Sequence, residues 1–275
     1  MRADFHVHTD ISDGSLGLRE TIQVAKENEV THMAITNHDT VKGLKEAIKE
    51  GDRKGIIIIP GIEISAYDFV NKKKVHILGY NFELEGKNIR KLCDPILERR
   101  NENSIRQIDI LKINGYKINT QNILRKSVNS EVIYKQHIMA ELIEKGYTDE
   151  IYSDLYKKLF KKGGICSGDI EYVDVFEAVK AIKADNGIAV LAHPGQLDSY
   201  GIIDELVAQG LDGIELNHMD HTEEDVTKIK EYSDKYGLIL TGGSDFHGEY
   251  GSSIKIGEIT APNEYISIFY KDAEK

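Results

Sequence analysis

The sequence contains little cysteine and no long apolar run. Its two cysteines, Cys93 and Cys166, lie far apart and form no CxxC pair, so we expect no disulfide framework and a reducing, cytoplasmic location. No run of about 18 apolar residues is present, so no helix is expected to span a membrane. The N-terminal segment MRADFHVHT also lacks the apolar region of a signal peptide.

Motifs of three common enzyme classes are missing as well. The chain has no GxxxxGK[ST] loop, no GxGxxG segment after an expected strand and no GxSxG motif. These absences argue against a P-loop NTPase, a dinucleotide-binding enzyme and a serine hydrolase of the α/β-hydrolase type.

Positive charge is scarce relative to negative charge. Lys and Arg number 35 against 46 Asp and Glu, which gives a formal net charge of −11 over 275 residues. Long duplex DNA is therefore not an expected partner, because binding it relies on a broad basic surface. A small phosphorylated substrate remains compatible, since bound cations can reverse the local field.

Histidine, by contrast, is abundant and patterned. Six of the ten histidines fall in short motifs typical of metal ligands, and three acidic residues accompany them. Nine such groups are too many for one ion, which usually takes about four to six ligands. They suit two or three ions joined by a bridging carboxylate, which indicates hydrolysis of a phosphate ester. The candidate ligands are His6, His8, Asp13, His38, Glu63, His76, His193, Asp245 and His247.

Strand-like and helix-like segments alternate before residue 85 and again after residue 174. This repetition predicts an α/β fold with parallel strands and helices outside. The candidate ligands lie at or just after the expected strand ends, which form the active face of parallel α/β barrels. They should therefore converge, although they span 240 positions. The expected strands are 3–9, 31–36, 55–65, 74–82, 187–194, 211–218 and 238–245.

Residues 87–173 interrupt the alternation. They contain charged, helix-like segments at 88–116, 136–147 and 149–160 and no apolar strand-like run. We expect an α-helical insert that caps the active face. The barrel domain would then consist of residues 1–86 and 174–275.

Several ligand motifs also have a purely structural interpretation. Asp13 could cap the helix that follows it, and we expect Asp39 or Thr40 to cap the helix after TNHDT. A lone glutamate in an apolar strand is costly to bury, so Glu63 is better explained as a metal bridge. His76, taken alone, would more often be a core histidine; its weight comes from the other motifs.

The remaining histidines and lysines give weaker signals. His218 follows an expected strand on the active face. The sequence favours a contact with substrate and a structural role equally for this residue. His137, in the insert, fits packing better than catalysis. We expect the lysine runs at 72–74 and 161–162 to be mostly solvated. Of these, only Lys161 and Lys162 are expected where a cap could meet a phosphate.

With these motifs in order, the chain resembles the polymerase and histidinol phosphatase (PHP) superfamily of metal phosphoesterases. The likeness covers about residues 1–85 and 174–250. The segments TNHDTVKGLKEA, PGIEIS, VHILGY and VLAHPG look like the bacterial subgroup that removes phosphate from nucleotides. That subgroup often has Arg-Pro before the histidine of an insert helix, where this chain has Lys135 and Gln136. Lysine meets a phosphate as a point charge, without the bidentate fork of arginine.

The resemblance implies a distorted seven-stranded barrel that binds two or three divalent ions, Mn, Zn or Fe. A hydroxide bridging two ions would attack phosphorus, and Glu63, Asp245 and His193 would carry catalysis. The implied sets are His6, His8, Glu63 and Asp245 for one ion, Glu63, His76 and His193 for a second, and Asp13, His38 and His247 for a third.

The resemblance also implies a substrate class. We expect a phosphomonoester of a small nucleotide: a nucleoside 3′,5′-bisphosphate, AMP or a short 5′-phosphorylated RNA. Contacts to it are expected from Lys135, His218, Lys161 and Lys162. Two alternatives stay open, a histidinol-phosphate phosphatase of the same superfamily and a non-catalytic PHP metal-binding module. The sequence predicts no particular oligomeric state.

Overall fold

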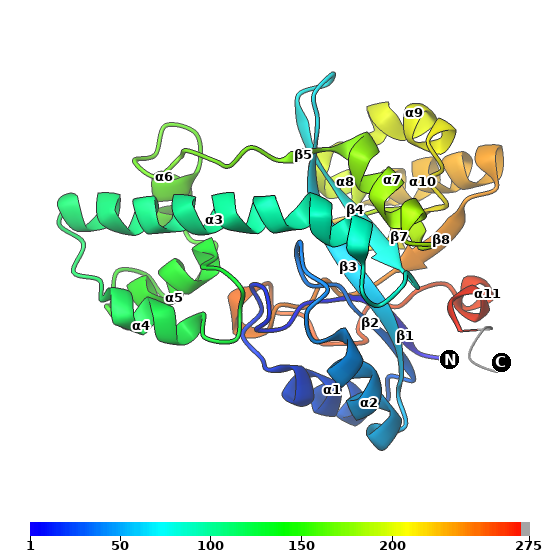
Figure 1. The fold of residues 1–275 in the computed structure, drawn as a ribbon, viewed down its shortest axis with the longest axis horizontal. Helices are drawn as coiled ribbons and strands as arrows, with labels where there is room; N and C mark the ends of the chain where they lie inside the picture. Colours follow the sequence, from blue (N-terminus) through cyan, green and yellow to red (C-terminus); the bar gives the residue numbers. More distant parts are fainter. Residues whose placement is uncertain (271–275) are drawn as a thin grey trace.

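Seven strands form a nearly closed barrel in the computed structural model, which describes residues 1–270 (Figure 1). The strand order is β1, β2, β3, β4, β6, β7, β8. A parallel bridge between Val7 and Phe246 brings β1 beside the segment that follows β8. The expected seven-stranded α/β barrel is confirmed. The strands are Ala3–Val7 (β1), His32–Ile35 (β2), Ile57–Asp68 (β3), Lys73–Tyr80 (β4), Ile188–Leu191 (β6), Gly213–Asn217 (β7) and Ile239–Gly242 (β8).

The barrel is mixed, whereas the sequence pattern predicted parallel strands. β4 pairs antiparallel with both β3 and β6. Residues 69–72 join β3 to β4, and so short a connection cannot make the crossover that parallel pairing needs. A two-residue strand, β5 (Val173–Asp174), adds to β3 beside Ala66.

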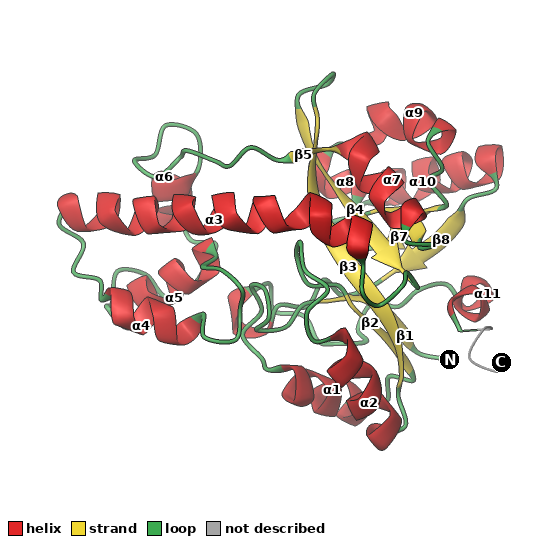
Figure 2. Cartoon of the chain, in the orientation of Figure 1, coloured by secondary structure: helices red, strands yellow, loops and turns green. Residues whose placement is uncertain are grey.

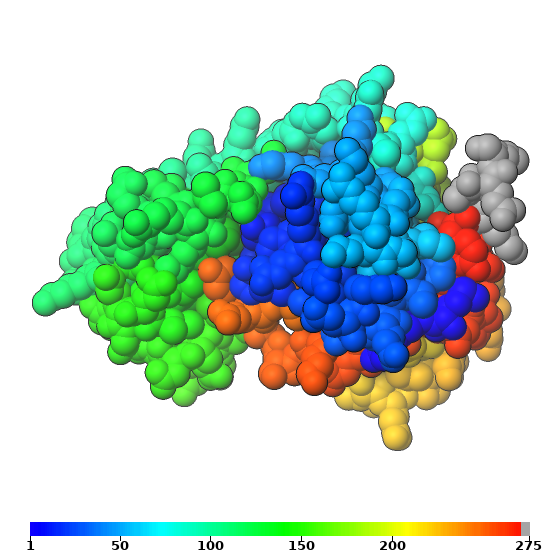
Figure 3. All heavy atoms as spheres, turned by 90° about the horizontal axis from the view of Figure 1, so that it is seen from below, coloured from blue at the N-terminus to red at the C-terminus, as the bar shows by residue number. Residues whose placement is uncertain are grey.

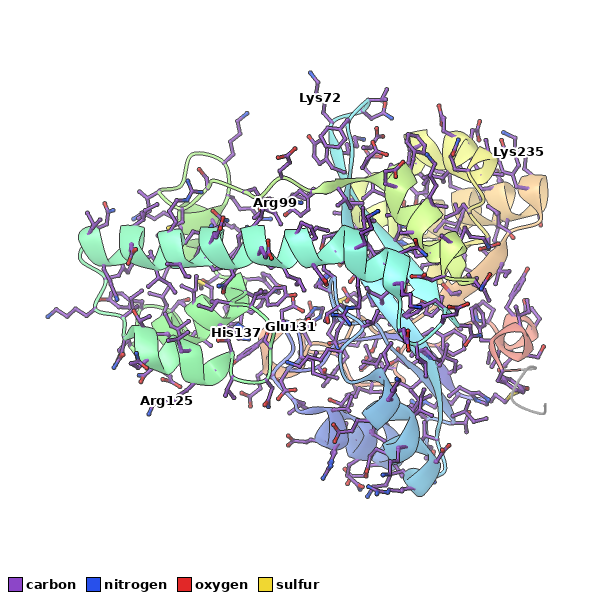
Figure 4. The ribbon with its side chains drawn as sticks, viewed as in Figure 1. Lys72, Arg99, Arg125, Glu131, His137 and Lys235 are labelled. Carbon is purple, nitrogen blue, oxygen red and sulfur yellow. The ribbon has the colours of Figure 1, made fainter. Side chains whose placement is uncertain are left out.

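The β3–β4 hairpin extends well beyond the rest of the barrel, with Lys72 at its tip (Figure 4). Glu63 and His76 therefore lie inside long strands. The expectation that every ligand sits at a strand end was wrong for these two residues. They still reach the active face, because β3 continues past that face and β4 returns through it.

Helices cover the outside of the sheet (Figure 2). Their inner faces are apolar; in the first helix, for example, Leu18, Ile22 and Ala25 are buried. Within residues 1–270, none has the length and apolarity that a membrane span requires. The outer α-helices are Leu18–Glu27 (α1), Leu44–Lys54 (α2), Val175–Ala184 (α7), Pro194–Leu197 (α8), Ile203–Ala208 (α9), Glu223–Tyr236 (α10) and Asn263–Ile266 (α11). Short 3₁₀ helices are Tyr200–Ile202 (η1), Gly248–Tyr250 (η2) and Ser267–Phe269 (η3).

The expected cap of the second helix was wrong. α2 begins after Gly43, whose φ of 81° lies in the left-handed region that favours glycine. The Asp39 carboxylate instead accepts the backbone N–H of Ser65 at 2.7 Å. The Thr40 hydroxyl donates to Glu131 at 2.6 Å. Neither side chain therefore caps α2; each binds a residue in another segment of the fold.

The insert is helical and forms a lobe beside the barrel (Figures 1 and 3). Its helices are Lys87–Ile113 (α3), Thr120–Lys126 (α4), Lys135–Glu144 (α5) and Asp154–Phe160 (α6), of which α4 was not expected. The first half of α3 packs into the barrel core, and its second half joins a separate apolar cluster that includes Ile108, Ile138 and Phe160. The domain division at residues 87 and 173 stays a prediction.

One end of the barrel interior is apolar. Leu78 and Tyr80 lie on the same face of β4 as His76, since alternate residues share a face. Both belong to a buried cluster that also contains Phe5 and Ile59. The Tyr80 hydroxyl donates to the carbonyl of Phe5 at 2.8 Å, which satisfies its polar group in this surrounding. The opposite end carries the candidate ligands.

The buried carboxylate of Asp4 joins the two edges of the barrel. It accepts the backbone N–H of Ser244 at 2.9 Å, the Ser244 hydroxyl at 2.7 Å and the backbone N–H of Gly257 at 2.7 Å. Burial raises the pKa of Asp4 to about 6 despite these hydrogen bonds, so the group is mostly ionised at neutral pH.

We predict that Asp4→Asn destabilises the protein by about 1–3 kcal/mol, because an amide nitrogen cannot accept hydrogen bonds and leaves buried donors unpaired. The free energy of unfolding should be measured in denaturant. Ser244→Ala removes one of the donors and should cost less. Equal stability of Asp4→Asn and wild type would show that Asp4 does not stabilise the closure.

Candidate metal centre

All nine candidate ligands converge at one end of the barrel. His6 lies in β1 and His8 just after it, while Asp13 and His38 come from the loops that follow β1 and β2. His193 follows β6 directly. Glu63 and His76 project from β3 and β4, and Asp245 and His247 follow β8. Six of the nine are buried, and His38, His76 and Asp245 are partly exposed.

Glu63 lies between two groups of imidazoles. Its Oε1 is 2.7 Å from His76 Nδ1 and 2.9 Å from His193 Nε2. Its Oε2 faces the other group, at 3.2 Å from His6 Nε2, 3.1 Å from His8 Nε2 and 3.3 Å from His38 Nδ1. One carboxylate thus offers each oxygen to a different set of ligands, which is the geometry that a bridging ligand needs.

The ligand atoms form three groups. The first contains His6, His8, Glu63 and Asp245, the same four residues as the first expected set. The Asp245 Oδ1 atom lies 3.3 Å from both imidazole Nε2 atoms of this group.

The other two groups differ from the expected sets in their histidines. Asp13, His38 and His247 are joined by His8, whose ring stacks on that of His247 with centroids 4.0 Å apart. Glu63 and His76 group with His38, while His193 touches the same Oε1 of Glu63. His8 and His38 therefore each belong to two groups, whereas the expected sets place each of them in one.

The cluster contains buried polar atoms that lack a hydrogen-bond partner. They are His6 Nε2, His8 Nδ1 and Nε2, His38 Nδ1, His193 Nδ1 and Asp245 Oδ1. Leaving such atoms unpaired is costly, and metal coordination would satisfy them. Imidazole and carboxylate donors without thiolate suit Mn, Fe or Zn. The residues present therefore fit divalent metal ions.

The acidic ligands are held in their charged form. Burial alone would raise the pKa of Glu63, but His38, His6 and His76 keep it well below its usual range. Burial likewise works against the charge of Asp13 and Asp245, and neighbouring imidazoles lower both pKa values. Ionised carboxylates are the form that binds metal.

Glu215 supports the ligands from behind. This fully buried residue of β7 accepts a hydrogen bond from His6 Nδ1 at 3.0 Å and from the backbone N–H of His193 at 2.8 Å. The first bond leaves His6 Nε2 free to face the ligand group. Glu215 belongs to none of the sequence motifs, although its place in the apolar strand GIELN is the same signal that identifies Glu63.

Two ligands sit on strained backbone. His193 has a φ of 23° and Asp245 a φ of 51°, values that non-glycine residues seldom adopt. The turn after His193 is fixed by His221, whose Nε2 accepts the backbone N–H of Gly195 at 3.3 Å. Strain of this kind persists where the surrounding structure enforces it, as it does in functional sites.

The insert contacts the ligand cluster directly. Gln136 Nε2 donates to Asp13 Oδ2 at 2.9 Å, and the Tyr134 hydroxyl donates to the carbonyl of His38 at 3.0 Å. His137 has a different role: its Nδ1 accepts the backbone N–H of Tyr134 in a capping interaction at the start of α5. Figure 4 shows His137 and Glu131 where the insert faces the barrel.

Arg100 is a further polar residue near the cluster that belongs to none of the sequence motifs. It reaches from α3 and donates to Asp39 Oδ2 at 2.6 Å and to the Ser65 hydroxyl at 3.1 Å. Asp39 neighbours the candidate ligand His38, and Ser65 pairs with the candidate ligand His76 across the strands. An arginine therefore lies beside the candidate centre. It comes from α3, whereas the subgroup motif places an arginine at the position of Lys135 in α5.

The expected substrate contacts divide into two pairs. His218 Nε2 lies 3.4 Å from Asp245 Oδ2, and Lys135, the first residue of α5, lies 3.6 Å from Asp169. Lys161 and Lys162 are exposed, and no contact joins them to the cluster within residues 1–270.

In the lysine run at 72–74, Lys73 pairs with Asp198 and Lys74 with Asp169, and both side chains stay partly exposed. Lys74 donates to Asp169 and to the Tyr172 hydroxyl, whereas Lys72 is exposed. A cavity of about 970 Å³ lies elsewhere; it is lined by parts of 40–46 and 84–94 and by Glu131. None of the nine ligands lines it, so cavity size does not identify the centre.

The barrel and its ligand cluster define a metal-dependent hydrolase of phosphate esters, and comparisons with known proteins support this class. Residues 4–241 match the model of the PHP domain, and the chain belongs to this family. It is 45% identical to the phosphoribosyl 1,2-cyclic phosphate 1,2-diphosphodiesterase of Eggerthella lenta, over 94% of this chain and 98% of the relative.

Two further similarities are more distant. The chain is 29% identical to the 3′,5′-nucleoside bisphosphate phosphatase of Chromobacterium violaceum, over 91% of this chain and 90% of the relative. A crystal structure from Bifidobacterium adolescentis, assigned as a metal-dependent phosphoesterase, matches with a TM-score of 0.90 and 25% identity. It covers 97% of this chain and 94% of the other.

We predict that Glu63→Ala lowers the content of bound metal and the rate of phosphate-ester hydrolysis more than Asp13→Ala does, because each oxygen of Glu63 faces a different ligand group. Metal content should be measured by mass spectrometry of the purified variants. Chelation should abolish turnover, and Mn or Zn should restore it. Wild-type metal content and rate in Glu63→Ala would contradict a bridging role.

We also predict that Glu215→Gln weakens metal affinity or activity by about 10–100-fold, a typical cost of losing a group that orients a ligand. The fold should be retained, which circular dichroism can verify. Glu205→Gln is the matched control, because Glu205 is exposed on α9. An equal effect of both substitutions would exclude a specific role of Glu215.

Proposed function

We propose that this chain is a metal-dependent phosphoesterase whose centre consists of the nine clustered ligands. The observation that carries the proposal is the position of Glu63, whose two oxygens face separate sets of imidazoles. A storage or sensor site would need no such bridge and no insert in contact with the ligands. In this proposal residues 87–173 form a cap that binds the part of the substrate that does not react.

When bound, divalent ions would neutralise charge on the phosphoryl oxygens and lower the pKa of a water that attacks phosphorus. The contact between Glu63 Oε1 and His193 Nε2 orients these two side chains relative to each other. Asp245 lies between His6 and His8 on one side and His218 on the other. Since His218 Nδ1 accepts the backbone N–H of Asp220, its proton is on Nε2, which points at Asp245.

The expected nucleotide monoester is one of two substrate classes that the relatives favour. The relative with 45% identity is named for a 1,2-cyclic phosphate of a phosphorylated ribose, and the relative with 29% identity for a nucleoside bisphosphate. Both names describe a ribose with more than one phosphate group. We place the cyclic phosphate first because identity to that relative is much higher, and the nucleotide monoester second.

This ranking predicts the outcome of a substrate panel. At one metal and pH, kcat/KM should be highest for phosphoribosyl 1,2-cyclic phosphate, followed by adenosine 3′,5′-bisphosphate. AMP, a short 5′-phosphorylated RNA and histidinol phosphate complete the panel. A clear lead for histidinol phosphate would overturn the ribose assignment. No turnover of any substrate with Mn, Zn or Fe would favour a non-catalytic metal-binding module.

A further inference from the structure

Beside the ligand cluster, two lysines from different parts of the fold share one carboxylate. Lys74 Nζ of β4 lies 2.5 Å from Asp169 Oδ2, and Lys135 Nζ at the start of α5 lies 3.6 Å from Asp169 Oδ1. The Tyr172 hydroxyl donates to Asp169 Oδ1 at 3.0 Å and accepts from Lys74 at 3.0 Å. We call Lys74, Lys135 and Tyr172 the anion site.

The charges of the anion site are not balanced. Two ammonium groups face the single negative charge of Asp169, and the neighbouring Arg100 is already paired with Asp39 at 2.6 Å. Burial lowers the pKa of Lys135; the charge of Asp169 opposes this effect, and the nearby charges of Lys74 and Arg100 add to it. A phosphate monoester carries almost two negative charges at neutral pH, so it would match the two lysines better than one carboxylate does.

The anion site is close to the metal ligands. Lys74 and His76 lie on the same face of β4, two residues and roughly 7 Å apart along the strand. Lys135 directly precedes Gln136, which donates to the ligand Asp13. A small sugar phosphate with one phosphate at the ligand cluster can therefore place a second phosphate at the anion site.

The backbone around Asp169 is held independently of its carboxylate. The side chains of Asn103 and Gln107 on α3 donate to the carbonyl of Gly168 at 3.2 and 3.3 Å. Arg99, labelled in Figure 4, donates to the carbonyl of Glu171 at 2.9 Å. Asp169 itself is about one-third exposed, at 32%. Its side chain can thus rotate towards solvent while the segment stays in place.

We infer that Asp169 occupies, in the free protein, the position of a substrate's second phosphate and is displaced from it when the substrate binds. Asp169 is then a specificity residue. A second phosphate replaces its contacts with the lysines, whereas a substrate with one phosphate leaves them in place. The identity of the ligand rests on the proposed function; the competition between Asp169 and a tetrahedral dianion does not.

Sulfate is a suitable probe, because it is a tetrahedral dianion that cannot be hydrolysed by this chemistry. Its affinity for the full-length purified protein should be measured by titration calorimetry. Asp169→Asn removes the competing charge with little change in shape, and we expect sulfate to bind about five- to tenfold more tightly. Glu171→Gln is the matched control, because it makes the same charge change on an exposed residue of the same segment.

The gain should disappear when Lys74→Gln is combined with Asp169→Asn, and Lys74→Gln alone should weaken sulfate binding. Unchanged or weaker binding by Asp169→Asn relative to Glu171→Gln would overturn the inference and leave Asp169 as a structural ion-pair partner. Since sulfate binding needs no turnover, failure of the proposed phosphoesterase activity would not affect this result. In an active enzyme, Asp169→Asn should lower KM for adenosine 3′,5′-bisphosphate more than it changes KM for AMP.

Discussion

The buried charge of Glu63 is the constraint on which the rest of the site depends. A carboxylate in the middle of an apolar strand is stable only if cations or hydrogen-bond donors surround it. The fold supplies five imidazoles around its two oxygens, taken from β1, β4 and the loops after β1, β2 and β6. The register of β3 with β4 then matters, because a slip of one residue would turn Glu63 to the opposite face.

The antiparallel hairpin gives this barrel a property that a fully parallel one lacks. β3 and β4 continue past the barrel rim, so a single hairpin carries ligands at its centre and Lys74 further out. The same hairpin meets Asp169 through Lys74, while Ser65 on β3 meets Arg100 of α3. The hairpin that carries two candidate metal ligands therefore also contacts two parts of the insert.

The sequence predicted the parts of the site that belong to local motifs. His6 and His8 alternate along one strand, and AHPG and GGSDFHG are short turns with recognisable residues, so their convergence followed from the strand pattern. Glu215 and Arg100 were missed because their roles arise from partners 209 and 61 positions away, respectively. The direction of β4 was missed because periodicity does not distinguish parallel from antiparallel pairing. Lys74 appeared to be one of three solvated lysines, since only tertiary packing separates it from Lys72.

The continuity of α3 restricts how the insert can vary. Its 27 residues span roughly 40 Å without a break, from the barrel core at one end to the apolar cluster of the insert at the other. Adding or removing one residue in its middle would turn everything beyond that point by about 100° and shift it by about 1.5 Å. Length changes during divergence are therefore tolerated at the ends of this helix, in the loops of the insert, or as near-whole turns. The distal lobe can then vary while the register between it and the barrel core is kept.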